Sequence, residues 1–202
     1  MKRRTFDLIR VHPSPLDRRR GRLVAGNIVV PCALGRSGTS HAKREGDGAS
    51  PVGRLALLQA FFRPDRGRRP RTYLPLRTIR RRDGWCDDPT DRRYNRLVPL
   101  PCAASHEDLW RTDHLYDVVV DLGWNRGPIV RGRGSAIFLH LAKPGFEPTA
   151  GCVAIARSAA LRLLERLGPS TRLEIVAPAL CRRSDMIRPQ PRSPKIALPT
   201  RT

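Results

Sequence analysis

Proline and glycine interrupt this chain so often that long regular elements have little room. Nineteen prolines and sixteen glycines are spread over 202 residues. Proline lacks the backbone N–H that inner helix and strand positions need, and glycine favours turns, so the segments between them are short. A chain of this length can bury one sizeable core. The sequence therefore predicts a mainly β fold of short strands with one or two short helices, rather than a helical bundle.

Short apolar runs between turn signals mark the expected strands. Residues 5–11 predict a first strand. Residues 22–35 predict a β-hairpin that turns at Ala25-Gly26-Asn27, because Gly-Asn tolerates the positive φ of tight hairpin turns. Further strands are expected at residues 54–62, 115–123, 135–142 and 171–177.

Two segments carry helix signals. Apolar residues between 157 and 167 recur at helical spacing, with Ser158 near the start and Gly168-Pro169 after the end, so an amphipathic helix is expected there. Ser105 with an acid three residues on predicts a short helix start over residues 105–110.

The remaining segments are predicted to be loops or tail. Residues 37–53 and 83–95 are dense in Gly, Ser, Asp and Pro and are expected to be loops. The basic stretch 63–82 is expected to be loop and edge strand. Residues 181–202 combine prolines with basic residues and predict a disordered tail, so the folded domain is expected to span residues 1–180.

The charge balance is strongly basic, with 39 Lys and Arg against 18 Asp and Glu and a net charge of +21. Nucleic acid or an anionic envelope polymer would suit such a charge. The basic residues are nearly all arginine and spread along the chain rather than forming one block. We therefore predict no specific nucleic-acid site, and a non-catalytic basic module that binds polyanions stays an alternative.

The five cysteines form no CxxC pair. Cys86 and Cys102 could form a disulfide in an oxidising compartment, or could be separate buried thiols. A zinc site that combined them with His106 and His114 would have poor ligand spacing. The adjacent acids Asp87-Asp88 lie in a predicted turn, where solvation or capping explains them. No metal and no cofactor are expected.

The first 20 residues begin with positive charge, as a signal peptide does, but lack its apolar stretch. No run of about 20 apolar residues occurs in the chain, so no transmembrane helix is expected. The sequence taken literally predicts a cytoplasmic chain.

One stretch carries candidate chemistry. SAIFLHLAKPGFEPTAGCVAIA runs from residue 135 to 156, with His140 at the end of an apolar run and Cys152 at the start of the next. A free thiol has a pKa of about 8.5, and a neighbouring histidine raises its reactivity near neutral pH. Gly151 permits a tight turn that can point N–H groups at a developing oxyanion. The spacing fits a cysteine nucleophile with its base, but on spacing alone a buried structural thiol and a satisfied histidine are the more common explanation.

Three motifs together resemble the L,D-transpeptidase catalytic-domain (YkuD) family of bacterial cell-wall enzymes. KREGDGASPVG at 43–53 is similar to that family's Gly-rich segment, AIFLH at 136–140 to its histidine strand, and TAGCV at 149–153 to its cysteine signature. The stretch 105–125 is similar to a proteobacterial branch of the family. The likeness spans roughly residues 5–177.

The resemblance implies a β-sandwich-like fold and a cysteine acyltransferase that acts on peptidoglycan stem peptides, as donor and as acceptor. Cys152 would be the nucleophile, and His140 the general base and later acid. Thr149, Gly151 and the Cys152 amide would line the oxyanion site. With water as the acceptor the same nucleophile would make an L,D-carboxypeptidase or hydrolase.

The resemblance also implies a periplasmic or cell-envelope location, against the cytoplasmic expectation above. The sequence departs from the family pattern at two positions. The family often has His before the Gly-Cys pair and Arg two residues after the cysteine, where this chain has Ala150 and Ala154.

Overall fold

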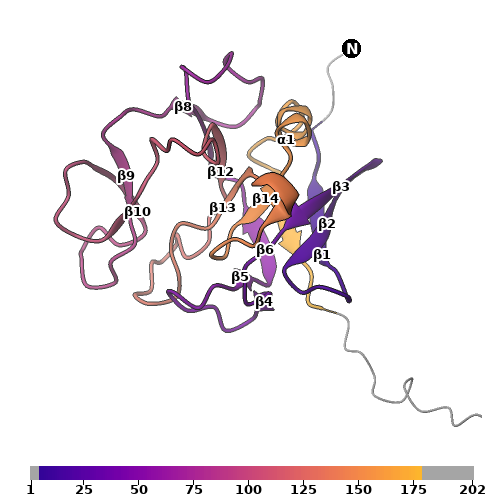
Figure 1. Ribbon diagram of the computed structural model, residues 1–202, viewed down its shortest axis with the longest axis horizontal. Coiled ribbons are helices and arrows are strands. Elements are labelled where there is room, and N and C mark those ends of the chain that lie inside the picture. Colours follow the sequence, from indigo (N-terminus) through magenta and orange to yellow (C-terminus); the bar gives the residue numbers. More distant parts are fainter. Residues whose placement is uncertain (1–4, 179–202) are drawn as a thin grey trace, which may run out of the picture.

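A ten-stranded mixed sheet that curls into a half-barrel forms most of the protein (Figure 1). The computed structural model describes residues 5–178. The expected mainly β class is therefore confirmed. In spatial order the sheet contains β6 (Gly53–Ala56), β15 (Arg172–Ile175), β1 (Leu8–Pro13), β2 (Arg20–Ala25), β3 (Ile28–Ala33), β14 (Val153–Ile155), β13 (Phe138–Leu141), β12 (Val118–Asp121), β7 (Gln59–Phe62) and β8 (Leu76–Thr78).

The predicted hairpin is confirmed as β2 and β3, whose register brings Ala25 opposite Ile28. Gly26 at the turn has a φ of +59°, a backbone conformation that favours glycine. The strands expected at 5–11, 115–123, 135–142 and 171–177 are confirmed as β1, β12, β13 and β15.

The apolar run 54–62 is two strands rather than the expected single one. β6 pairs with β15 and β7 pairs with β12, so the two halves lie in different parts of the sheet. The chain changes direction between them, where the Leu58 N–H donates to the Asp121 carbonyl at 3.0 Å. The apolar character of the run could not reveal that the partner strand changes.

A second, three-stranded sheet stands beside the main one, with the order β10 (Arg96–Pro99), β9 (Asp83–Cys86) and β11 (His106–Asp108). Two expectations were wrong here. Residues 83–95, expected to be loop, begin with β9, and the helix expected at 105–110 is the strand β11. β11 is antiparallel to β9, with His106 opposite Cys86, and this non-local pairing overrides the local capping pattern.

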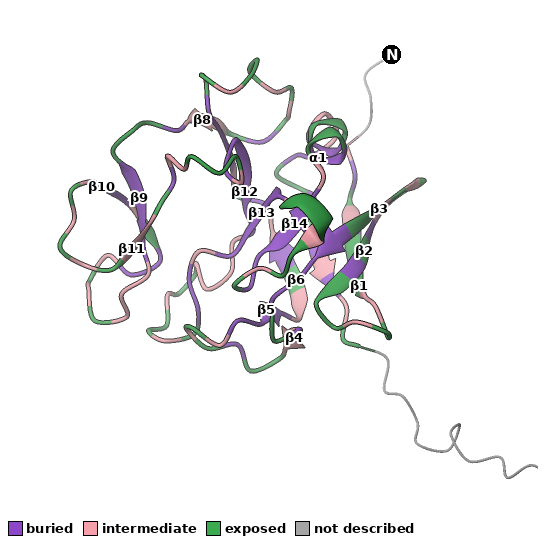
Figure 2. Cartoon of the chain, viewed as in Figure 1, coloured by how far each residue is buried: buried purple, intermediate pink, exposed green. Residues whose placement is uncertain are grey.

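Aromatic packing joins the two sheets. Trp85 of β9 meets Phe138 of β13 edge to face, with ring centroids 5.0 Å apart. The same apolar cluster contains Tyr116 and Cys152. Buried residues, purple in Figure 2, run through β9, β12, β13 and β14. The strands that carry the sequence-predicted site therefore lie in the interior, where the small sheet meets the large one.

The helix expected at 157–167 is confirmed as α1 (Arg157–Leu164), which buries Leu163 and Leu164 against the larger core. Its N-cap residue is Ala156, and Ser158 lies in the first turn as expected. A 3-10 turn, η1 (Pro144–Phe146), follows β13. The expected loop 37–53 is irregular apart from the two-residue strands β4 (Thr39–Ser40) and β5 (Ser50–Pro51).

Within residues 5–178, Cys86 and Cys102 are free thiols, as are Cys32 and Cys152. The separate-thiol alternative is therefore the one that this structure shows. No helix in this part of the chain is long and apolar enough to cross a membrane. The tail expected at 181–202 lies outside the described residues.

Candidate active site

Cys152 lies in the middle of the large sheet, immediately before β14. β14 runs parallel to β13 on one side and antiparallel to β3 on the other. Cys152 is buried, with 7% of the residue exposed. Its Sγ–H donates to the Ala136 carbonyl at 3.2 Å, and the sulfur accepts the Phe138 N–H at 3.3 Å. Two backbone groups thus hold the thiol in place.

His140 lies on the adjacent strand β13, in register with Ala154 of β14. Its Nδ1 is 2.9 Å from the Leu141 carbonyl oxygen. A carbonyl only accepts hydrogen bonds, so Nδ1 carries the proton and Nε2 of the neutral ring is the acceptor. The Tyr116 ring packs edge-on against the imidazole, with centroids 5.3 Å apart. This contact and the Leu141 bond orient a ring that can serve as a base through Nε2.

Both groups are neutral at rest. Burial, with a smaller contribution from the nearby Glu107 carboxylate, raises the pKa of the Cys152 thiol to about 12. Burial lowers the pKa of His140 to about 4. The resting site is therefore a thiol beside an unprotonated imidazole, not a thiolate–imidazolium pair. Such a thiol becomes a good nucleophile when a base removes its proton during attack.

The turn before Cys152 is held by two hydroxyl groups. Thr149 Oγ1 donates to the Cys152 carbonyl at 2.7 Å and accepts the Gly151 N–H at 3.1 Å. Ser50 Oγ donates to the same carbonyl at 3.3 Å. Gly151 has a φ of +144°, which side-chain-bearing residues rarely adopt. The Thr149 hydroxyl and the Gly151 N–H thus bond within the turn and fix the backbone at Cys152.

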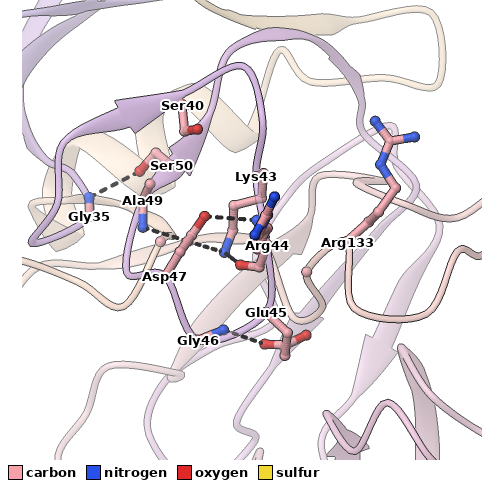
Figure 3. Close-up of polar contacts among 12 residues, drawn as sticks. Gly35, Ser40, Lys43, Arg44, Glu45, Gly46, Asp47, Ala49, Ser50 and Arg133 are labelled. Atoms are coloured by element: carbon pink, nitrogen blue, oxygen red, sulfur yellow. Dashed lines mark hydrogen bonds and ion pairs between the residues drawn. The ribbon is translucent and has the colours of Figure 1, made fainter.

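The Gly-rich loop of the sequence motif packs under this turn. Lys43, with 2% of its side chain exposed, donates from Nζ to Asp47 Oδ1 and to the Arg44 carbonyl, both at 2.6 Å (Figure 3). Asp47 Oδ1 also accepts the Ala49 N–H at 2.8 Å. A buried ammonium requires a partner of this kind, because its desolvation is unfavourable. The loop is a rigid support that brings Ala49 against Gly151.

A cavity of about 610 Å³ opens beside the thiol and the imidazole. Its size falls within the usual range of ligand sites. All four residues singled out from the sequence line it, as do both positions that depart from the family pattern: Cys152, His140, Thr149, Gly151, Ala150 and Ala154. The residues predicted from the sequence therefore all line one cavity.

Sequence reasoning did not single out two further residues that line the cavity, Glu107 and Tyr116. The Tyr116 hydroxyl donates to Glu107 Oε1 at 2.6 Å. Glu107 was part of the supposed helix start, and the alternation His-Glu-Asp of β11 was the signal that could have placed its side chain on the opposite face from its neighbours. No group of three or more His, Cys, Asp or Glu residues in the described chain could hold a metal ion.

Two comparisons relate the chain to known proteins. The family model for the L,D-transpeptidase catalytic domain (YkuD) matches residues 12–175. Among solved structures, the chain is similar to L,D-transpeptidase 1 of Mycobacterium tuberculosis, with 10% identity and a TM-score of 0.38; the match covers 84% of this chain and 62% of that one. This chain thus spans less than two thirds of that protein's length. No curated protein matches the sequence.

Proposed function

The chain belongs to the L,D-transpeptidase catalytic-domain family, and on that premise we propose that it is a cysteine acyltransferase that acts on peptidoglycan stem peptides. The observation that carries the proposal is the placement of Cys152 and His140 on neighbouring parts of one sheet, both lining one cavity. The bond from His140 Nδ1 to the Leu141 carbonyl supports Nε2 as the base.

The proposed reaction begins with the neutral pair. As Sγ of Cys152 attacks the amide carbonyl carbon of the donor stem peptide, His140 Nε2 takes the thiol proton. The carbonyl oxygen becomes an oxyanion beside the Cys152 N–H, in the site that Thr149 and Gly151 shape. The C–N bond then breaks, and His140 protonates the leaving amine. A thioester on Cys152 results.

The acceptor decides the product. An amine from a second stem peptide resolves the thioester into a cross-link, and water resolves it into a shortened peptide. The first outcome is transpeptidation and the second is hydrolysis by the same nucleophile. We propose the catalytic domain to be residues 1–180. Family membership implies a place in the cell envelope, where peptidoglycan lies.

Intact-mass measurement after incubation with a stem tetrapeptide or a carbapenem tests the proposal. We expect one adduct per chain, which Cys152→Ala abolishes and which Cys102→Ala retains. Cys102 is a suitable control because it is a partly exposed free thiol and is not among the residues that line the cavity. An adduct that survives Cys152→Ala would refute the assignment of the nucleophile.

A further inference from the structure

Glu107 faces the catalytic centre from the small sheet. It lies on β11 and lines the same cavity as Cys152 and His140. Its Oε1 accepts the Tyr116 hydroxyl at 2.6 Å, while Oε2 has no hydrogen-bond partner among residues 5–178. Tyr116 in turn packs against the His140 ring. One oxygen of the carboxylate is therefore anchored by a residue that touches the base, and the other remains available to a ligand.

A carboxylate in this place works against the nucleophile of the free enzyme. Glu107 is close enough to Cys152 to raise the pKa of the thiol, in addition to the larger effect of burial. Burial also raises the pKa of the Glu107 carboxyl itself, although the Tyr116 hydroxyl offsets part of that rise. Thiolate formation would be easier with an apolar residue here. A carboxylate that disfavours acylation of Cys152 is better explained by a role in the second step, the reaction of the thioester with the acceptor.

The charges around the cavity leave Glu107 poorly paired. The nearest cation, Arg111, is 3.8 Å from Glu107 Oε1, and its guanidinium is bonded to Asp113 at 2.5 Å. The two lysines that line the cavity also have carboxylate partners, Lys43 with Asp47 and Lys143 with Glu147. The chain as a whole carries a net charge of +21. Glu107 nevertheless lines the cavity without a cation that pairs with it alone.

Asp87 provides a second observation at the same end of the cavity. It lines the cavity and adds negative potential at Glu107. Its Oδ1 is buried and has no hydrogen-bond partner among the described residues. That oxygen has almost no accessible surface, so a ligand in the cavity experiences the charge of Asp87 rather than a hydrogen bond to this atom. Two neighbouring carboxylates, of which Glu107 has an unused oxygen, fit a group that carries N–H donors and a positive charge.

We propose that Glu107, oriented by Tyr116, binds the ammonium group of the amine acceptor and takes its first proton, which directs the thioester towards aminolysis rather than hydrolysis. This inference rests on the proposed acyltransferase function. Glu107 is then a specificity-determining residue that contacts the acceptor, and Asp87 contributes to the same ammonium site.

The proposed step begins with the acceptor in its protonated form, R–NH3+. One proton passes to the Glu107 carboxylate, and the freed lone pair on nitrogen forms a C–N bond to the thioester carbon. His140 Nε2 takes a second proton from that nitrogen. The C–S bond breaks with its electron pair on Sγ, and His140 returns the proton to Sγ. The products are an amide, the Cys152 thiol and a neutral Glu107, which releases its proton to solvent.

Glu107→Gln tests the step, since glutamine keeps the shape and can still accept the Tyr116 hydrogen bond. The protein is incubated with a stem tetrapeptide that ends in D-alanine and with D-methionine as the acceptor, and mass spectrometry separates the aminolysis product from the hydrolysed tripeptide. We expect the ratio of aminolysis to hydrolysis to fall at least about tenfold, the scale of one charge-assisted hydrogen bond. The rate of Cys152 acylation should not fall, because the variant removes a charge that raises the pKa of the thiol.

Glu147→Gln is the matched control. Glu147 also lines the cavity, but it is exposed and paired with Lys143, so its removal should leave the ratio within about twofold of wild type. An unchanged ratio in Glu107→Gln, or an equal fall in both variants, would overturn the inference while acylation still supported the acyltransferase. Loss of acylation in the wild-type protein would instead refute the proposed function, and the inference with it.

A measurement on the wild-type protein does not depend on how a variant folds. tert-Butylammonium and tert-butanol have the same shape, but only the ammonium carries a positive charge and three N–H donors. Its nitrogen is too hindered to attack the thioester, so tert-butylammonium should compete with D-methionine and lower the aminolysis ratio, and the neutral alcohol should not. An equal effect of the two compounds would contradict an ammonium site.

Discussion

Gly151 lies directly against the Ala49 carbonyl: a Cβ added at Gly151 would stand 2.9 Å from that oxygen. The contact joins the Gly-rich loop to the turn that carries Cys152. Two sequence motifs about a hundred residues apart therefore meet at one backbone position, and the geometry of the thiol depends on both.

Gly151→Ala should destabilise the fold by about 1–3 kcal/mol and slow acylation of Cys152, because it combines an unfavourable φ with a backbone clash. Urea unfolding and carbapenem adduct formation measure the two effects. Gly53→Ala is the control, since Gly53 has a φ of +130° but open space around its missing Cβ. If Gly53→Ala slowed acylation as much, contact with Ala49 would not be the cause.

The buried pair of Lys43 and Asp47 should matter for stability rather than for chemistry. Asp47→Ala leaves a buried ammonium without its carboxylate, and we expect a loss of about 3 kcal/mol in urea unfolding. The double variant with Lys43→Met should recover part of that loss, because no unpaired charge remains. Glu147→Ala breaks an exposed pair and should change stability by less than about 1 kcal/mol. Equal losses of stability in Asp47→Ala and Glu147→Ala would contradict this expectation.

Much of the larger sheet could be predicted from the sequence. The β2–β3 hairpin, β13 and α1 follow from local turn chemistry and periodicity, and all three were expected. The order His140, loop, Cys152 also predicted that the two side chains could come together. The structure places them on adjacent parts of the sheet because β13 and β14 are parallel neighbours.

The small sheet could not be predicted in the same way. β9 and β11 are short segments with turn-forming or capping residues, and they become strands because each pairs with residues far along the chain. The pairing of β11 with β9 also changes the role expected of Glu107. In the expected helix start it would be one acid of the first turn, but on β11 it lines the cavity with Cys152. The cavity's charge pattern therefore depends on tertiary pairing that no local motif encodes.

The rate of Cys152 acylation should vary little between about pH 6 and pH 8, because the reacting form is the neutral pair. Lowering pH protonates His140 only near its pKa of about 4, and raising pH ionises the thiol only near its pKa of about 12. Carbapenem adduct formation followed across this range measures the profile. N-acetylcysteine with the same carbapenem should accelerate with pH up to about 8.5. A parallel rise in the enzyme would indicate a thiolate nucleophile instead.

Stability should fall on acidification through His140. Its folded pKa of about 4 lies below the ordinary value of 6.5, so the unfolded chain binds the proton first. The stability that depends on a neutral His140 is fully present above pH 6.5 and is lost as pH falls towards 4. His140→Gln, which cannot titrate, should show a shallower decline in unfolding free energy than wild type over this window. His41→Gln, which changes an exposed histidine, should follow the wild-type curve.

Tyr116 supports the site in two separable ways, through its ring and through its hydroxyl. Tyr116→Phe removes the donor to Glu107 Oε1 but keeps the ring against His140 and Phe138. We expect a loss of about 1–3 kcal/mol in urea unfolding, because a partly buried carboxylate loses its hydrogen bond. Acylation of Cys152 should stay within about threefold of wild type, because the imidazole keeps its packing.

Tyr116→Ala removes the ring as well, and should cost about 3–5 kcal/mol and slow acylation strongly, because His140 loses the surface that orients it. Intact-mass kinetics at a temperature where both variants remain folded separates the two contributions. If Tyr116→Phe slowed acylation as much as Tyr116→Ala, the hydroxyl and its bond to Glu107, rather than the ring, would be what holds the base in place.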